Sequence, residues 1–134
     1  MDLGFGVSDI VKLAAKVSAA YRDAPDSYRH ISEEVEALQG LIIGARQRLK
    51  SISSSSDEFR AGQKVLISCH SLLADLNSIV KKYNILASPS SSRAIQRIML
   101  STEDIPSLRA RITSNVSLLN GFLIQRFDIP TLSI

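Results

Sequence analysis

The sequence predicts an all-α protein, an up-down helix bundle of four long helices plus one short helix. Apolar residues recur at intervals of three and four along most of the chain, which is the spacing of a helix face. Prolines and serine runs divide the chain into segments of helix length, and the alternation typical of a β-strand is almost absent. The length of 134 residues fits one domain around one hydrophobic core.

The first two helices are expected over about residues 8–24 and 26–51. Ser8 is a suitable N-cap for the first helix, and Pro25 ends it because the residue before a proline avoids the α region. Pro25 also suits the first turn of the second helix, where its missing N–H is not needed. Apolar residues of the second helix step by three and four through three heptads, which is typical of a helix buried along one seam.

The third helix is expected over about residues 57–84. The serine run 53–56 that precedes it is interpreted as a solvated linker. Ser55, with Glu58 three residues later, resembles a capping box at the start of this helix. Asn84 is suited to end the helix in a left-handed conformation.

The last part of the chain is expected to contain a short amphipathic helix over 92–100 and a long helix over 104–127. Pro106 is tolerated only in a first turn, so the long helix should begin near Asp104. The residues 128–130 end in a proline and are expected to stop it.

The apolar stripes of these helices define the expected core. Its members are Val35, Leu38, Ile42, Leu49, Leu66, Cys69, Leu73, Leu76, Ile112, Val116 and Leu119. Gly40 and Gly44 are four residues apart in the second helix, a spacing that lets two helices approach closely. Because Glu36, Arg46 and Arg48 flank this pair, close helix packing within the protein is favoured over transmembrane pairing.

Catalytic chemistry is not expected from this sequence. His30 and His70 are predicted on different helices, and Cys69 points about 100° away from His70 on the same helix. Cys69 falls on the apolar stripe, which favours a small buried hydrophobe. The spacing of a metal site and a glycine-rich phosphate loop are both missing. We therefore expect no enzyme activity, no catalytic residues, no metal and no cofactor.

Composition and charge narrow the classes of protein further. A single cysteine favours a reducing compartment, and the longest apolar runs are far shorter than the roughly 20 residues of a membrane span. The first residues lack the basic charge of a secretory signal, so a cytoplasmic protein is expected. Residues 61–134 hold eight basic and four acidic residues, yet no basic cluster interleaved with aromatics. Nucleic acid is therefore not expected as a partner.

The first helix has two interpretations. Lys12 and Lys16 lie one turn apart, opposite an apolar face, so the helix could lie in a membrane interface. The same face could instead pack into the bundle, and spacing alone favours packing, because every bundle helix is amphipathic.

Six blocks of the sequence carry a resemblance to a known family; they are residues 4–10, 24–25, 32–38, 93–99, 103–105 and 108–120. Together they resemble the fungal HeLo-like N-terminal domains of NLR-type receptors and amyloid-signalling cell-death proteins. The chain departs from the glycine zipper of some members, because Gly4 and Gly6 are two residues apart instead of four.

The resemblance implies a bundle related to the HeLo cell-death domain and similar to the four-helix bundle of the mixed-lineage-kinase-like pseudokinase. It implies that the protein self-associates and that an upstream receptor or amyloid-motif partner clusters it. It also implies that the N-terminal region then engages and permeabilises the plasma membrane. Together with the apolar start and the two lysines, it leads us to expect a set of residues that engage anionic membrane lipid. These are Leu3, Phe5, Val7, Ile10, Val11, Lys12 and Lys16.

The expected protein is thus an effector of fungal regulated cell death or non-self recognition that permeabilises membranes through its N-terminal helix. The alternative is a non-enzymatic module that binds or oligomerises proteins, at the N-terminus of a NACHT or ankyrin-repeat receptor, without lipid activity. Residues 1–128 are expected to form the bundle and residues 129–134 the start of a linker to an absent module. The effector would be cytoplasmic and would relocate to the plasma membrane on activation.

Overall fold

The structure of the protein, a computed structural model, describes residues 6–22, 26–82 and 105–132. These residues form four α-helices, and no β-strand occurs among them. The described part of the chain is therefore a helical bundle, as the sequence predicted. The short helix expected over 92–100 lies outside the described residues.

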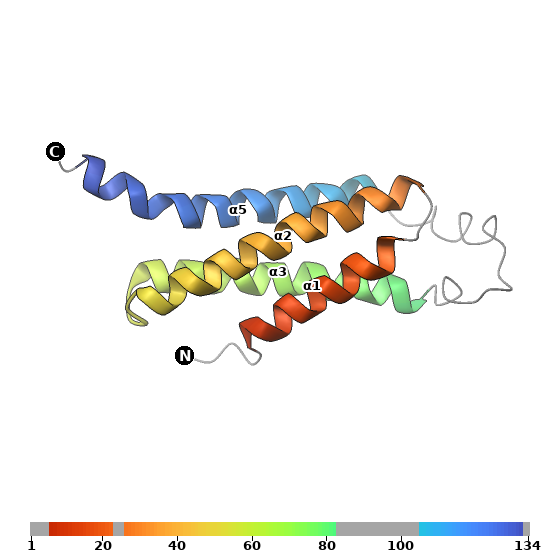
Figure 1. The fold of residues 1–134 in the computed structure, drawn as a ribbon, viewed down its shortest axis with the longest axis horizontal. Coiled ribbons are helices and arrows are strands. Elements are labelled where there is room, and N and C mark those ends of the chain that lie inside the picture. The colour runs from red at the N-terminus through yellow and green to blue at the C-terminus, as the bar shows by residue number, and fades with distance from the viewer. Residues whose placement is uncertain (1–5, 23–25, 83–104, 133–134) are drawn as a thin grey trace, which may run out of the picture.

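The four helices are α1 (Val7–Arg22), α2 (Asp26–Ser51), α3 (Asp57–Lys82) and α5 (Ile105–Leu132). Figure 1 shows that consecutive long helices run in opposite directions, so α1 is parallel to α3, and α2 to α5. α1 and α5 each pack against both α2 and α3, from opposite sides of that pair.

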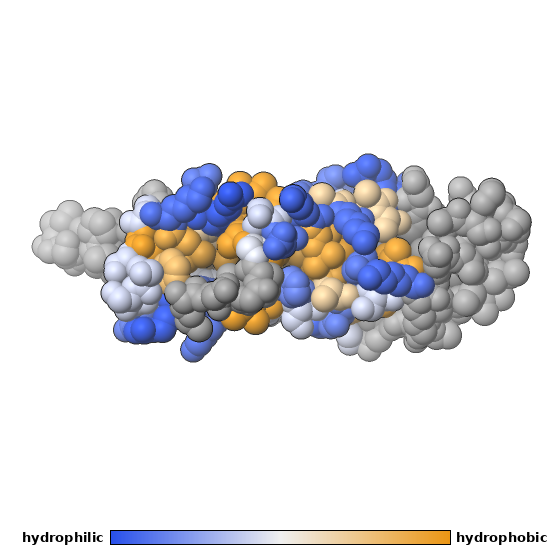
Figure 2. All heavy atoms as spheres, turned by 90° about the horizontal axis from the view of Figure 1, so that it is seen from below, coloured by the Kyte–Doolittle hydropathy of each residue, from blue (hydrophilic) through white to orange (hydrophobic). Residues whose placement is uncertain are grey.

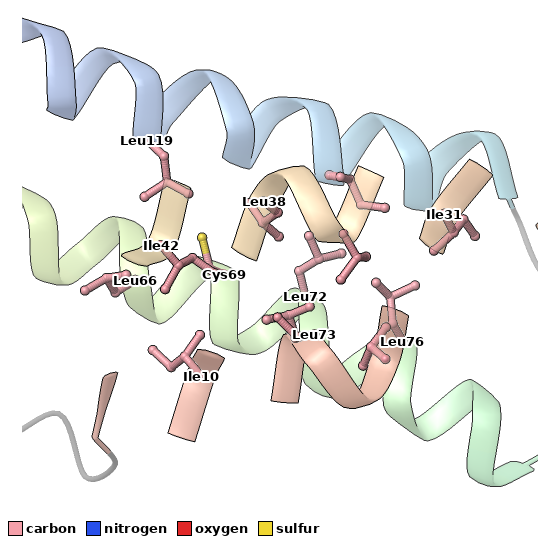
Figure 3. Packing of buried hydrophobic residues seen from close by; sticks show 14 of the residues in the cluster. Ile10, Ile31, Leu38, Ile42, Leu66, Cys69, Leu72, Leu73, Leu76 and Leu119 are labelled. Atoms are coloured by element: carbon pink, nitrogen blue, oxygen red, sulfur yellow. The ribbon is translucent and has the colours of Figure 1, made fainter. Parts of the chain in front are cut away.

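The core fills the space between all four helices. Figure 3 shows it through Ile10 of α1, Leu38 of α2, Leu72 of α3 and Leu119 of α5, whose side chains point inward. Every residue of the expected core is buried except Leu49 and Val116, which are half-buried and pack against the core from its edge. Full burial of one such aliphatic side chain contributes about 1.5–3 kcal/mol, so this cluster is the main source of stability.

The caps at the starts of α1 and α3 lie two residues and one residue away from those expected. The Gly6 amide donates to the Asp9 carboxylate over 3.0 Å, so Gly6 and not Ser8 precedes the first turn of α1. At α3 the Phe59 amide donates to the Ser56 hydroxyl over 3.1 Å. Ser56 is the cap there because it directly precedes the first helical residue, which corrects the assignment to Ser55.

The end of α5 differs from the expectation. The helix continues to Leu132, through residues 128–130, where the sequence predicted a stop, and it includes the first residues of the expected linker. Pro130 lies two residues before the end.

The two glycines expected at a close helix crossing behave differently. A Cβ atom on Gly44 would lie 3.4 Å from Leu123 Cδ1, so α2 and α5 do approach closely there. A Cβ atom on Gly40 would meet nothing within 4 Å, so its assignment to close packing is wrong. The tightest site is Gly62 of α3, where a Cβ atom would lie 2.7 Å from Phe122 Cζ.

Candidate interaction site at α1

The apolar side of α1 faces the core of the bundle. Ile10, Val17 and Tyr21 are buried against α2 and α3, while Val7 and Val11 are half-buried at the edge of the core. Of the residues expected to engage lipid, Ile10 is therefore inaccessible while α1 is docked. Leu3 and Phe5 lie outside the described residues.

A buried serine pair joins α1 to α2. The Ser18 hydroxyl lies 3.1 Å from the Ser32 carbonyl oxygen, and the Ser32 hydroxyl donates to the Ser18 carbonyl oxygen over 2.7 Å. The two hydroxyl oxygens are 3.2 Å apart, and both residues are almost fully enclosed. The small side chains let the two backbones approach, and each hydroxyl finds a partner that offsets its loss of water.

Three further polar contacts hold α1 in place. The Tyr21 hydroxyl donates to the Leu76 carbonyl oxygen of α3 over 3.1 Å, and the Gln39 amide of α2 donates to the Val11 carbonyl oxygen over 3.2 Å. Arg22 forms a longer, exposed ion pair with Glu36 at 3.5 Å. We call the serine pair together with Tyr21 and Gln39 the α1 latch. None of these polar contacts was predicted from the sequence. Serine, tyrosine and glutamine also occur on exposed helix faces, so their presence does not indicate a buried hydrogen bond.

The outer side of α1 carries Lys12 and Lys16, both exposed. Within the described residues, neither lysine forms an ion pair. The only described acid on α1, Asp9, accepts the hydrogen bond from Gly6. The outer side of α1 is therefore a basic surface above an apolar one, as the first interpretation of this helix requires.

On the opposite side of the bundle, Arg109 and Arg111, the basic residues of α5 whose side chains the structure describes, are paired. Arg109 donates to both carboxylate oxygens of Glu34 in α2, at 3.0 and 3.2 Å. The hydrogen bond and the negative charge of Glu34 raise the pKa of Arg109. Arg111 pairs with Asp75 of α3 at 2.8 Å. These pairs neutralise the α5 side, whereas the lysines of α1 keep their charge exposed.

A buried arginine at the end of the bundle was not foreseen. Arg48 of α2 is only 5% exposed, pairs with Glu58 of α3, and lies 5.4 Å from the centre of the Phe122 ring. Phe122 in turn occupies the space left by Gly62. This cluster joins α2, α3 and α5, and it explains why Glu58 does not act in a capping box.

The residues considered for catalysis do not converge. Cys69 is buried, its thiol lies 3.6 Å from the Asn115 side-chain oxygen, and burial raises the pKa of this thiol to about 12. His30 is exposed on α2, and His70 is half-buried on α3. No group of three or more His, Cys, Asp or Glu residues in the described part of the chain could hold a metal ion.

Within the described ranges, no helix combines the length and the apolar composition that a membrane crossing needs. Comparison of the chain with models of protein families, with curated proteins and with solved structures finds no match.

Proposed function

We propose that this protein is a HeLo-like effector of regulated cell death, which oligomerises on activation and permeabilises membranes through its N-terminal helix. One observation supports it above the others. α1 has exposed lysines on its outer side and an apolar inner side, and a few polar contacts reinforce its seat on the bundle. Such a helix is suited to exchange one apolar environment, the core, for another, the membrane interface.

The energies of the two states are close to balanced. Each neutral hydrogen bond of the α1 latch contributes about 0.5–1.5 kcal/mol, and the buried side chains of α1 contribute several kcal/mol more. In a membrane interface, the apolar side chains of α1 are again removed from water, which recovers much of the free energy lost on leaving the core. Each lysine near an anionic surface stabilises the membrane-bound state by about 1 kcal/mol more. A single copy should therefore release α1 rarely, and clustering should favour release by avidity.

The decisive experiment locks α1 to α2. The hydroxyl oxygens of Ser18 and Ser32 are 3.2 Å apart, so the double variant Ser18→Cys with Ser32→Cys brings two thiols within reach of a disulfide. The protein is clustered through a fused inducible oligomerisation tag and added to phosphatidylserine-containing vesicles filled with dye. We expect leakage by wild type, little leakage by the oxidised variant, and recovery after reduction.

The controls for this experiment are the single variants Ser18→Cys and Ser32→Cys, which cannot form the cross-link and should leak as wild type does under both conditions. If the oxidised double variant, with its cross-link verified by mass, leaks as fast as the reduced one, release of α1 is not the mechanism.

A second candidate function is supported by a different surface. Leu118 and Ile124 of α5 are 49% and 55% exposed, on the helix opposite α1. Large apolar side chains in the open are suited to bind another protein. This favours the alternative of an interaction module without lipid activity. If clustered wild type leaves vesicles intact, while Leu118→Ser with Ile124→Ser abolishes self-association, the alternative becomes the better proposal.

A further inference from the structure

Exposed apolar and basic side chains gather around α1. Ile43 of α2 and Ile67 of α3 are 43% and 46% exposed, although isoleucine is among the residue types that are most often buried. Figure 2 views the bundle from below, the side on which α1 lies in Figure 1, and shows apolar atoms along the middle of the surface with hydrophilic side chains around them.

Helix geometry indicates where each isoleucine lies relative to α1 and α5. Ile43 follows Gln39 by one turn, and Gln39 is the residue of α2 that reaches the backbone of α1. On α3, Gly62 and Cys69 face α5, as their contacts with Phe122 and Asn115 show. At 100° per residue, Ile67 lies about 140° from Gly62 and about 160° from Cys69, which places it on the outer side of α3, away from α5.

Lys64 adds a third helix to the basic surface. It precedes Ile67 by three residues, so the two side chains are neighbours on the outer side of α3. We call Lys12, Lys16, Ile43, Lys64 and Ile67 together the α1 face.

The α1 face keeps a positive charge within the described residues, because its three lysines outnumber Asp9, the described acid of α1. The described acids of α3 are all engaged elsewhere: Asp57 pairs with Arg60, Glu58 with Arg48, and Asp75 with Arg111. Lys12, Lys16 and Lys64 form no ion pair among the described residues, and all three are exposed. A partner for this face must therefore be anionic, and it must also accept apolar side chains.

We propose that the α1 face is the surface with which the folded bundle docks on an anionic lipid bilayer, before α1 is released. Lysines beside half-exposed isoleucines match the headgroup region, where the ammonium groups meet phosphates and the isoleucines reach the acyl boundary. This inference rests on the proposed function, but it assigns the first contact to three helices and requires no opening of the latch. α3 thereby contributes a lipid contact that lies far from the N-terminal region in sequence.

The test measures binding of the unclustered full chain to vesicles by co-sedimentation, separately from leakage. The variant Lys64→Gln with Ile67→Ser changes only α3 and leaves the N-terminal region intact. Its controls on α5 are Ser114→Glu and Ser117→Glu, each of which makes the same change of one charge unit at an exposed position. Circular dichroism verifies that each variant keeps its helices.

We expect wild type to bind phosphatidylserine-containing vesicles and to ignore pure phosphatidylcholine vesicles. Lys64→Gln with Ile67→Ser should weaken this binding by about tenfold, whereas each α5 control should change it by less than about twofold. The oxidised Ser18→Cys with Ser32→Cys variant should bind like wild type, because docking precedes release.

Three outcomes would overturn the inference. If the α3 variant binds like wild type while clustered wild type still leaks vesicles, the docking face is wrong and the proposed function stands. If the α5 controls weaken binding as much as the α3 variant does, attraction is nonspecific. If wild type neither binds vesicles nor makes them leak after clustering, both proposals fail.

Discussion

The helices α1 and α5 occupy equivalent places on opposite sides of the α2–α3 pair, yet they are held in different ways. α5 has 28 residues, fits Phe122 into the space above Gly62, and forms ion pairs with both neighbours. α1 has 16 residues and combines a short apolar side with the buried contacts of the α1 latch.

This difference teaches which helix is suited to move. The side chains of α5 interlock with Gly62 and Gly44, so displacing it would open cavities in two helices. Displacing α1 exposes Ile10, Val17 and Tyr21, which are fully buried. The hydrogen bonds that it breaks involve serine, tyrosine and amide groups, which water or lipid headgroups can satisfy. We therefore regard α2, α3 and α5 as the frame of the bundle and α1 as its detachable part.

The largest loss of stability is expected at Leu38, a residue that supports the packing of both α1 and α5. Leu38 of α2 is fully buried at the centre of the core, between α1 and α5. Leu38→Asp would bury an unpaired carboxylate and should cost several kcal/mol, comparable to the whole stability of a small domain. Thermal melts followed by circular dichroism measure it. A variant that melts within a few degrees of wild type would contradict the central role of Leu38.

The next effect separates the frame from the detachable part. Phe122→Ala should lower the free energy of unfolding by about 3–5 kcal/mol, because it leaves a cavity over Gly62 and removes the ring above Arg48. Urea unfolding measures the loss, with exposed Ile124→Ala on the same helix as the control. A loss no larger than that of the control would show that α5 is not seated by this ring.

The frame was largely predictable from the sequence, whereas the contacts that tell α1 from α5 were not. The three-and-four spacing from Val35 to Leu38 and Ile42 predicts a buried helix face, and these residues are buried. Gly40 and Gly44 share a spacing but not a neighbour, since only Gly44 meets Leu123. A sequence shows which residues share a face, but not which helix lies opposite.

Single residues with no periodic pattern were missed for a related reason. Arg48 reads as a solvated charge, but Glu58 and Phe122 from two other helices enclose it. Ser18 and Ser32 are 14 residues apart and read as ordinary polar positions. Their pairing depends on the crossing of two helices, which local propensity does not encode. The expected extent of the domain, residues 1–128, stays a prediction.

A smaller effect is expected from the thiol beneath α5. Burial raises the pKa of Cys69 to about 12 from an ordinary value of 9.0, so above pH 9 the unfolded chain loses this proton while the folded chain keeps it. The contribution of the neutral thiol to stability is therefore complete below pH 9 and declines as the pH rises toward 12. The decline should be about 1.4 kcal/mol for each pH unit.

Urea unfolding of wild type and Cys69→Ala between pH 7 and pH 10 isolates this decline, because the other titrating groups are common to both proteins. Wild type should be the more stable at pH 7, and its advantage should shrink by about 1 kcal/mol at pH 10. A constant difference over this range would contradict the burial of Cys69.

The last effect is the most direct comparison of the two helices. Ser18 of α1 and Asn115 of α5 are both buried, at 2% and 5% exposure, and both face α2 or α3. In a Cys69→Ala background, Ser18→Cys and Asn115→Cys place one thiol under each helix.

Labelling by a thiol reagent under native conditions then reports how often each helix opens, since a buried thiol reacts only when it is exposed. The proposed release of α1 without the frame predicts that Ser18→Cys is labelled about tenfold faster or more, which corresponds to an opening free energy at least about 1.4 kcal/mol lower. Rates that agree within a factor of about two would mean that both helices open only by global unfolding. In that case α1 is as firmly held as α5, and its role as the detachable part of the bundle would have to be abandoned.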